Sequence, residues 1–170
     1  MSTELKPGRY TVRYVPPGIQ LPFIGGLYAN PKEIHQPIAG EALGPRTQVW
    51  DVEPAQDGKF TIVRPGVIPS KDDPAGSSTS LLGWNVGWPN ELSPKGIVLL
   101  DDGYTEFEIK PVGEGEKLMY SIQDTSGSSI PENKYYIAID NKQQLVSWPY
   151  DMNQEEGQLL PHWQFTPFSN

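Results

Sequence analysis

The sequence predicts an all-β protein, and three observations lead to this prediction. Glycine and proline are numerous, with 17 and 18 among 170 residues, and they separate short apolar segments along the whole chain. Several of these segments alternate apolar and polar residues with the period of two that is typical of strands, as in residues 107–111 (FEIKP). No segment of useful length shows the 3.6-residue period of an amphipathic helix.

Two short motifs recur three times in the same order. The first, an aromatic residue, Ser or Thr, and an aliphatic residue, occurs at 10–12, 60–62 and 120–122. The second ends in proline and occurs at 50–54 (WDVEP), 107–111 (FEIKP) and 163–167 (WQFTP), with spacings of 57 and 56 residues. This order indicates an internal repeat. We therefore expect a single domain, 1–170, with repeats of roughly 8–56, 57–113 and 117–168.

Further strand-like runs lie between these motifs, at 26–29, 80–82, 97–100, 135–139 and 144–148. About four strands in each of three repeats is the pattern of a β-trefoil of roughly twelve strands, in which a closed barrel removes edge strands. Trp50, Phe107 and Trp163 would then be core residues. For Trp84 and Trp88, in the stretch GWNVGWPNE, packing over a barrel end is the commoner interpretation, with exposure for sugar stacking as the alternative.

Composition argues against several classes of partner. The net charge of −8 and the pI of about 4.7 argue against nucleic acids and anionic membranes, which attract basic surfaces. There is no cysteine, hence no disulfide, thiolate metal site or cysteine nucleophile. The first residues, MSTELKPG, lack the features of a signal peptide, and the longest aliphatic run, 97–100, is too short to span a bilayer. We expect a cytoplasmic monomer.

The sequence offers little catalytic chemistry. His35 and His162 are the only imidazoles, and 124–127 (DTSG) differs from the Asp-Thr-Gly of aspartic proteases by an inserted Ser. Because Asp, Ser and Gly are common in turns, a turn explains 124–127 better than a catalytic site. Motifs for a serine nucleophile, a zinc protease or a phosphate loop are missing from the sequence. We expect no enzyme, no cofactor and no metal site.

Two loops are better candidates for function. Residues 15–24 contain three prolines together with Ile19, Leu21, Phe23 and Ile24. An apolar loop stiffened by proline suits binding, because little conformational entropy is left to lose; the alternative is that Leu21 and Ile24 close the barrel end. The following Gly25 and Gly26 would let the backbone enter a narrow groove, such as a protease cleft. A second loop, 40–45, lies between glycine and proline before the Trp50 strand.

The residues GGLYA (25–29), PIAGEALGP (37–45), Trp50 and FTI (60–62) resemble the mycocypins, mushroom β-trefoil inhibitors of papain-like cysteine proteases that include the macrocypins and clitocypin. The likeness is densest from Gly8 to Ile62. The related fungal cocaprins, which inhibit cysteine and aspartic proteases, are similar as well.

The resemblance implies a reversible inhibitor that occludes the protease cleft with loops. It assigns the first protease-binding loop to Phe23, Ile24, Gly25, Gly26 and Leu27, and the second to Glu41, Ala42, Leu43, Gly44 and Pro45. A loop against a second protease would lie within 65–74, at Ile68, Pro69, Ser70 and Lys71. That loop has no Asn, which argues against legumain as a target. Lys71 is interpreted as a solvated loop lysine, because two aspartates follow it and no disulfide braces the loop; entry into a trypsin-type pocket is the alternative.

Two other classes of function stay open. Sugar-binding trefoils often carry Gln-x-Trp in each repeat, and Gln48-Val49-Trp50 has this pattern in one repeat of three. A carbohydrate-binding lectin is therefore the main alternative. A β-rich interaction or storage protein, with no loop directed at a cleft, is the third interpretation.

Overall fold

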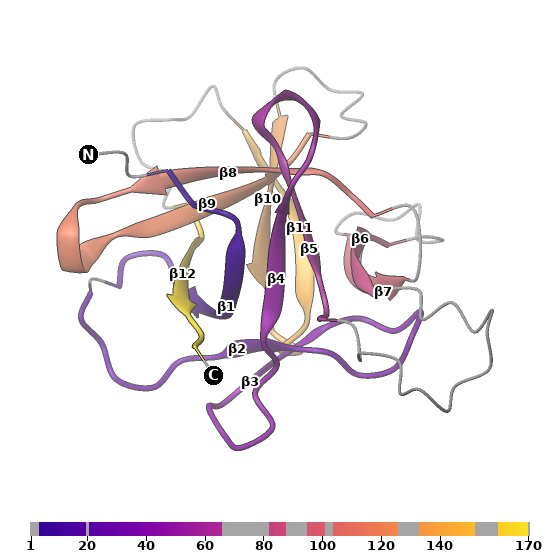
Figure 1. Cartoon of the computed structure of the whole chain (residues 1–170), viewed down its shortest axis with the longest axis horizontal. Helices are drawn as coiled ribbons and strands as arrows, with labels where there is room; N and C mark the ends of the chain where they lie inside the picture. Colours follow the sequence, from indigo (N-terminus) through magenta and orange to yellow (C-terminus); the bar gives the residue numbers. More distant parts are fainter. Residues whose placement is uncertain are drawn as a thin grey trace.

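The computed structural model describes residues 4–19, 21–65, 82–87, 95–100, 104–125, 133–151 and 160–169. These residues form a twelve-stranded antiparallel sheet (Figure 1). The only helical segments among them are two short 3-10 turns, η1 (Gln56–Gly58) and η2 (Gly115–Lys117). The prediction of an all-β protein is confirmed. None of the described segments is a helix long and apolar enough to cross a membrane.

The strands fall into three successive groups of four along the chain. The first group comprises β1 (Gly8–Val15), β2 (Tyr28–Asn30), β3 (Ala39–Glu41) and β4 (Trp50–Pro54). The second comprises β5 (Phe60–Val63), β6 (Gly83–Val86), β7 (Lys95–Leu100) and β8 (Phe107–Val112). The third comprises β9 (Met119–Asp124), β10 (Asn133–Ile139), β11 (Leu145–Asp151) and β12 (His162–Pro167).

The same strand pairings recur in each group. In the first group β1 pairs with β2 and with β4, and β2 pairs with β3. The corresponding pairings are present among β5 to β8 and among β9 to β12. The last strand of each group pairs with the first strand of the next, and β12 pairs with β1. The pairings thus run through β1, β4, β5, β8, β9 and β12 and return to β1.

The two sequence motifs of each group meet within the sheet. Tyr10 lies opposite Trp50, Phe60 opposite Phe107, and Tyr120 opposite Trp163. Each pair joins the first aromatic residue of a group to its closing aromatic residue. Paired positions on neighbouring strands place their side chains on the same face, so the motif residues supply the core with three aromatic pairs.

The sheet as a whole is not a closed barrel, and the expectation that closure removes every edge is wrong. The strand order runs from β10 to β3, and β2 is the only named strand that pairs with β3 in the described residues. The physical reason is length, because β2 and β3 have only three residues each. Beyond its partner β2, the β3 strand makes a single isolated bridge, between Ala39 and Gln144.

Three strand predictions also need correction. Gly26 and Leu27 precede β2 rather than forming its start, because Gly26 has a φ of 94°, which is incompatible with a strand. Of the run predicted at 80–82, Leu82 precedes β6 (Gly83–Val86), and residues 80–81 lie outside the described segments. The short β3 strand was not predicted, because Ala, Gly and Glu are poor strand formers.

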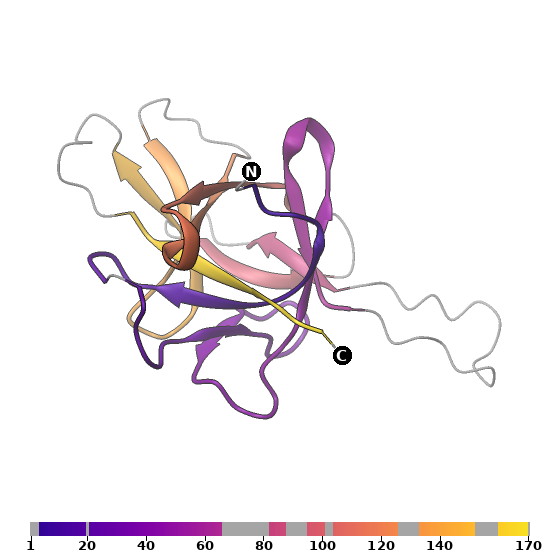
Figure 2. The ribbon, with the colours of Figure 1, turned by 60° about the vertical axis from the view of Figure 1, so that its left-hand side comes forward.

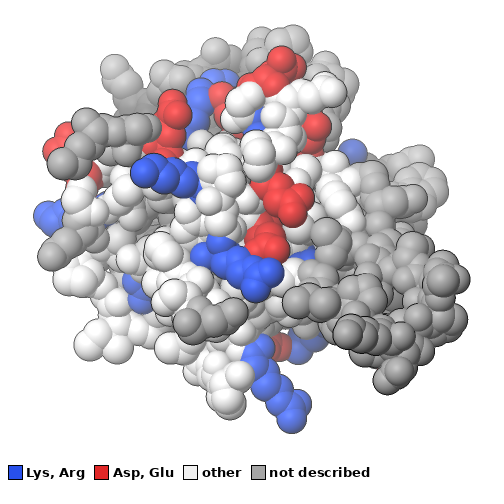
Figure 3. Space-filling view, in the orientation of Figure 1, with Lys and Arg blue, Asp and Glu red and all other residues white. Residues whose placement is uncertain are grey.

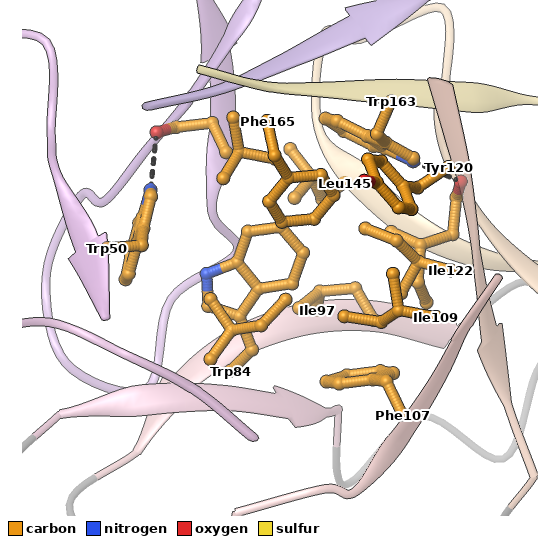
Figure 4. Packing of buried hydrophobic residues seen from close by; sticks show 14 of the residues in the cluster. Trp50, Trp84, Ile97, Phe107, Ile109, Tyr120, Ile122, Leu145, Trp163 and Phe165 are labelled. Atoms are coloured by element: carbon orange, nitrogen blue, oxygen red, sulfur yellow. Dashed lines mark hydrogen bonds between the residues drawn. The ribbon is translucent and has the colours of Figure 1, made fainter. Parts of the chain in front are cut away.

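Four aromatic residues occupy the centre of the core (Figure 4). Trp50, Phe107 and Trp163 are fully buried, as predicted. Trp84 is also fully buried and lies between them, with ring centroids 5.6 Å from Trp50 and 6.2 Å from each of the other two. Of the two alternatives for Trp84, exposure for sugar stacking is therefore wrong, and packing inside the protein is what the structure has. Trp88 lies outside the described residues.

Two of the three buried indoles are hydrogen-bonded in the same way. Trp50 Nε1 donates to the carbonyl of Ala29 on β2 at 2.9 Å, and Trp163 Nε1 donates to the carbonyl of Ile137 on β10 at 2.8 Å. These strands hold the same place in the first and third groups. Trp84 Nε1 has no hydrogen-bond partner among the described residues.

Candidate functional site

The structure brings the first two predicted loops to the same end of one short hairpin. We call residues 16–27, between β1 and β2, the first loop, and residues 42–49, between β3 and β4, the second loop. Tyr28 pairs with Glu41, so the first loop ends and the second loop begins at the same edge of the β2–β3 ladder. In Figures 1 and 2 the first loop lies on the left and the second loop at the bottom of the molecule.

The base of the first loop is closed by the backbone. Tyr14 N donates to the carbonyl of Leu27 at 2.8 Å, and Ile19 N donates to that of Pro16 at 3.1 Å. Leu21 is only 4 % exposed, so this side chain does fill the interior. Ile24 does not fill the interior, because its relative exposure is 102 %.

Arg13 on β1 holds the tip of the first loop. Its Nη1 donates to the carbonyls of Phe23 at 3.1 Å and Gly25 at 3.0 Å. Its guanidinium also lies over the Phe23 ring, 4.2 Å from the centroid, in cation–π geometry. Nη2 donates to Gln164 Oε1 on β12. Because a guanidinium is a rigid planar donor, these contacts tie the loop to two strands of the sheet.

Both glycines of the loop need their lack of a side chain, for different reasons. Gly25 has a φ of 87° and Gly26 a φ of 94°, a region that L-residues rarely adopt. A Cβ at Gly26 would lie 3.0 Å from the Phe23 ring, whereas a Cβ at Gly25 would meet nothing within 4 Å. Gly26 therefore serves the packing of the loop itself, and Gly25 leaves open space at its tip.

The surface of the two loops is largely apolar, and the first loop carries no charged residue. Leu43 in the second loop is 66 % exposed, and Ile19 in the first is 44 % exposed. The sequence has no charged residue from Tyr14 to Pro31, and Arg46 is the only charged residue of the second loop. Figure 3 shows mostly white atoms at the lower left of the molecule and blue atoms at its bottom. A largely apolar surface on a protein of net charge −8 is a candidate contact surface.

Asn30 on β2 anchors the second loop from inside. It is buried, its Nδ2 donates to Glu41 Oε2 at 3.0 Å, and its Oδ1 accepts from Gln48 N at 2.7 Å. It therefore spans both ends of the loop. Between these ends the loop turns at Gly44, whose N donates to Thr47 Oγ1 at 2.9 Å and whose carbonyl accepts from Thr47 N at 3.1 Å.

Glu41 belongs to the scaffold rather than to the second loop. It is the last residue of β3, and Lys32 Nζ also contacts its carboxylate. Hydrogen bonds from Asn30 and then from Lys32 hold the pKa of Glu41 below its ordinary value. The sequence assignment of the second loop is therefore corrected at its first residue, while Ala42, Leu43, Gly44 and Pro45 lie in the loop.

Sequence reasoning missed Arg13, Asn30 and Gln164. All three lie on strands, and their importance comes from contacts across the sheet that no local motif signals. Leu27 depends on such a contact too. A Cβ at Gly40 would lie 3.2 Å from Leu27 Cβ, so the glycine on β3 leaves room for this end of the first loop.

The structure does not place the other predicted residues at this site. Ile68, Pro69, Ser70 and Lys71 lie outside the described residues. Asp124, from the pattern similar to aspartic proteases, is buried at the end of β9 with Ser147 Oγ 3.5 Å from its carboxylate. The described part of the chain holds no group of three or more metal-ligating side chains.

A scan against models of known protein families finds no match, and neither does a search of curated protein sequences. The two loops and the residue pattern of their sequence are therefore the features that bear on function.

Proposed function

We propose that the protein is a reversible inhibitor of papain-like cysteine proteases that blocks the active-site cleft with its first and second loops. One observation carries the proposal. Ile24 projects fully into solvent, two glycines without side chains follow it, and Arg13 holds the backbone on either side. The resemblance of residues 25–29 and 37–45 to the mycocypins points to the same target class.

The geometry suits occlusion of a narrow groove. A thin loop tip can enter a cleft that a bulkier surface cannot, and the neighbouring second loop adds Leu43 to the contact surface. Loops already held in place lose little conformational entropy on binding. A protease–inhibitor contact of ordinary size buries about 1,600 Å² in total. Because the mechanism is steric, it needs no catalytic residue and no cofactor.

We also propose that the fold is a β-trefoil. What supports this is the threefold recurrence of the strand pairings, together with three aromatic pairs at equivalent positions. The proposal takes the protein to be a monomer. The proposal also places the protein in a reducing compartment such as the cytoplasm, because the chain has no cysteine.

The Gln-x-Trp motif at 48–50 gives little support to the alternative of a lectin. Trp50 is buried, Gln48 Nε2 donates to the carbonyl of Val49 at 2.6 Å, and Gln48 N donates to Asn30. These groups are engaged within the protein. Inhibition of aspartic proteases, or of trypsin through Lys71, stays a prediction.

The test is a titration of papain with the purified protein, with pepsin and trypsin in parallel. We expect stoichiometric, reversible loss of papain activity. Added inhibition of pepsin would indicate a second target class. Inhibition of trypsin alone would move the site to the segment 65–74 that contains Lys71, and no effect on any of the three proteases would favour a glycan-binding assay.

A matched pair of variants tests the role of the loop tip. Gly25 and Gly58 both have a positive φ and open space around a Cβ, and asparagine tolerates such a φ. Gly58 lies in the β4–β5 connection, away from the β2–β3 hairpin. We expect Gly25→Asn to weaken papain inhibition by about tenfold or more, equal to about 1.4 kcal/mol, and Gly58→Asn to leave it unchanged. Equal inhibition by both variants would contradict the proposed site.

A further inference from the structure

We infer that Ile24 is the anchor of the first loop, and that it enters an apolar pocket beside the cleft of the target protease. This inference rests on the proposed function and assigns one residue and one pocket chemistry to it. The starting observation is that the other large apolar side chains at the tip are engaged within the protein. Leu21 is buried, Phe23 lies beneath the Arg13 guanidinium, and Leu27 is half-buried, lying where a Cβ at Gly40 would come within 3.2 Å of its own Cβ.

Ile24 is the exception at this tip. Its exposure of 102 % means that the folded chain covers none of its side chain. An isoleucine gains much by leaving water, so its burial on a partner would be strongly favourable. The neighbouring Gly25 adds no atoms that would keep a partner away, since even a Cβ there would meet nothing within 4 Å.

The backbone around Ile24 is held, so the side chain is presented in a defined place. Arg13 Nη1 bonds the carbonyls of Phe23 and Gly25, the two residues that flank Ile24. The sequence from Tyr14 to Pro31 carries no charge, and the nearby guanidinium of Arg13 is engaged by the loop carbonyls, by Gln164 and by the Phe23 ring. The chemistry that fits this side chain is therefore an apolar pocket that accepts a branched aliphatic group.

The experiment compares two isoleucines with the same substitutions. Ile34, in the β2–β3 connection, is 42 % exposed and lies at the other end of the hairpin from the first loop. We expect Ile24→Ala to weaken papain inhibition about tenfold to a hundredfold, the loss that matches full burial of this side chain. Ile24→Asp should weaken it further, because it would place a charge in an apolar pocket. Ile24→Val should come close to the wild type.

The controls separate binding from folding. Ile34→Ala and Ile34→Asp should inhibit papain within about threefold of the wild type, a change near the limit of detection. Thermal unfolding of the Ile24 variants should match that of the wild type, because Ile24 has no contacts to lose in the free protein.

The outcomes distinguish this inference from the function on which it rests. If the wild type and Ile24→Asp inhibit papain equally well, the role of Ile24 is overturned and the proposed function stands. Equal losses for the Ile24 and Ile34 variants would overturn it too, because the effect would not be specific to the tip. A wild-type protein that does not inhibit papain at all would overturn both.

Discussion

Arg13 connects the first loop to the sheet through contacts that are each modest. Two hydrogen bonds to carbonyls, one to Gln164 and one ring contact with Phe23 act on a single guanidinium. A loop with adjacent glycines would otherwise sample many backbone conformations. We therefore regard Arg13 as a positioning residue that sets the shape of the loop.

We expect Arg13→Met to loosen the first loop and to weaken papain inhibition by about tenfold, because the loop would then lose entropy on binding. Methionine keeps much of the length of the side chain and removes its donors. The measurement is the ¹⁵N relaxation of Gly25 and Gly26, which should report faster backbone motion in the variant.

Arg9→Met is the control for this change. Arg9 lies on the same strand, and its Nε contacts Asp51 Oδ1 at 2.9 Å, away from the loop. The control should retain the relaxation and the inhibition of the wild type. A rigid loop and full inhibition in Arg13→Met would show that the arginine does not position the tip.

His162 makes stability depend on pH. It pairs with Val15 at the base of the first loop, and burial lowers its pKa from the ordinary 6.5. Between pH 6.5 and this lowered value, the unfolded chain binds a proton that the native protein does not. The free energy of unfolding should therefore fall as the pH drops below 6.5.

The measurement is the melting temperature from pH 7.5 to 5 for the wild type and His162→Gln. The wild type should lose more stability on acidification than the variant over this interval, since glutamine does not titrate. Parallel curves for the two proteins would contradict the assigned role of His162.

At the scale of elements, the β2–β3 hairpin determines how the two loops lie. Its ladder pairs Tyr28 with Glu41, which places both loops at one edge. Asn30 then connects the beginning and the end of the second loop through Glu41 and Gln48. A hairpin of two three-residue strands is a weak unit by itself. The hydrogen bonds of Asn30 therefore stabilise the second loop, which follows this hairpin.

We expect Asn30→Ala to lower the free energy of unfolding by about 1–3 kcal/mol, because it leaves buried polar groups without a partner. The pKa of Glu41 should rise towards its ordinary value, since its first hydrogen-bond donor is lost. Urea denaturation and an NMR titration of Glu41 measure the two effects.

Asn30→Asp gives the matched comparison. It keeps an acceptor for Gln48 N but brings a second carboxylate to Glu41, so it should be most destabilising at neutral pH and less so in acid. A cost for Asn30→Asp that is independent of pH would argue against the pairing with Glu41.

At the scale of the whole molecule, three tryptophans and Phe107 form one core, but they are not equivalent. Trp50 and Trp163 each donate to a backbone carbonyl of the second strand in their own group. Trp84 is central and fully buried, yet its indole N–H has no partner among the described residues. An unpaired buried donor has a cost that the packing of the ring must offset.

This difference predicts an order of stabilities among three equivalent substitutions. Trp50→Phe and Trp163→Phe should each cost about 0.5–1.5 kcal/mol more than Trp84→Phe, because only the first two lose a hydrogen bond and leave a carbonyl unpaired. Urea denaturation of the three variants measures this order. A cost for Trp84→Phe equal to or above the other two would point to a bonded indole.

The sequence by itself determined the parts of the structure that depend on local pattern. Alternating residues and strand-ending prolines located β4 and β8, and the repeated aromatic residues identified Trp50, Phe107 and Trp163 as core. Period-two alternation reports which face of a strand is buried, so it reveals these residues without knowledge of their partners. The residue pattern likewise located the two loops.

Only the tertiary structure decided which residues of those loops face inward and which are held. It buried Leu21 and exposed Ile24, moved Glu41 into β3 and placed Trp84 at the centre of the core. It also showed Arg13 and Asn30 as the residues that hold the loops. The physical reason is that these roles arise from contacts between segments far apart in sequence, such as Arg13 with Gln164, and such contacts leave no periodic trace along the chain.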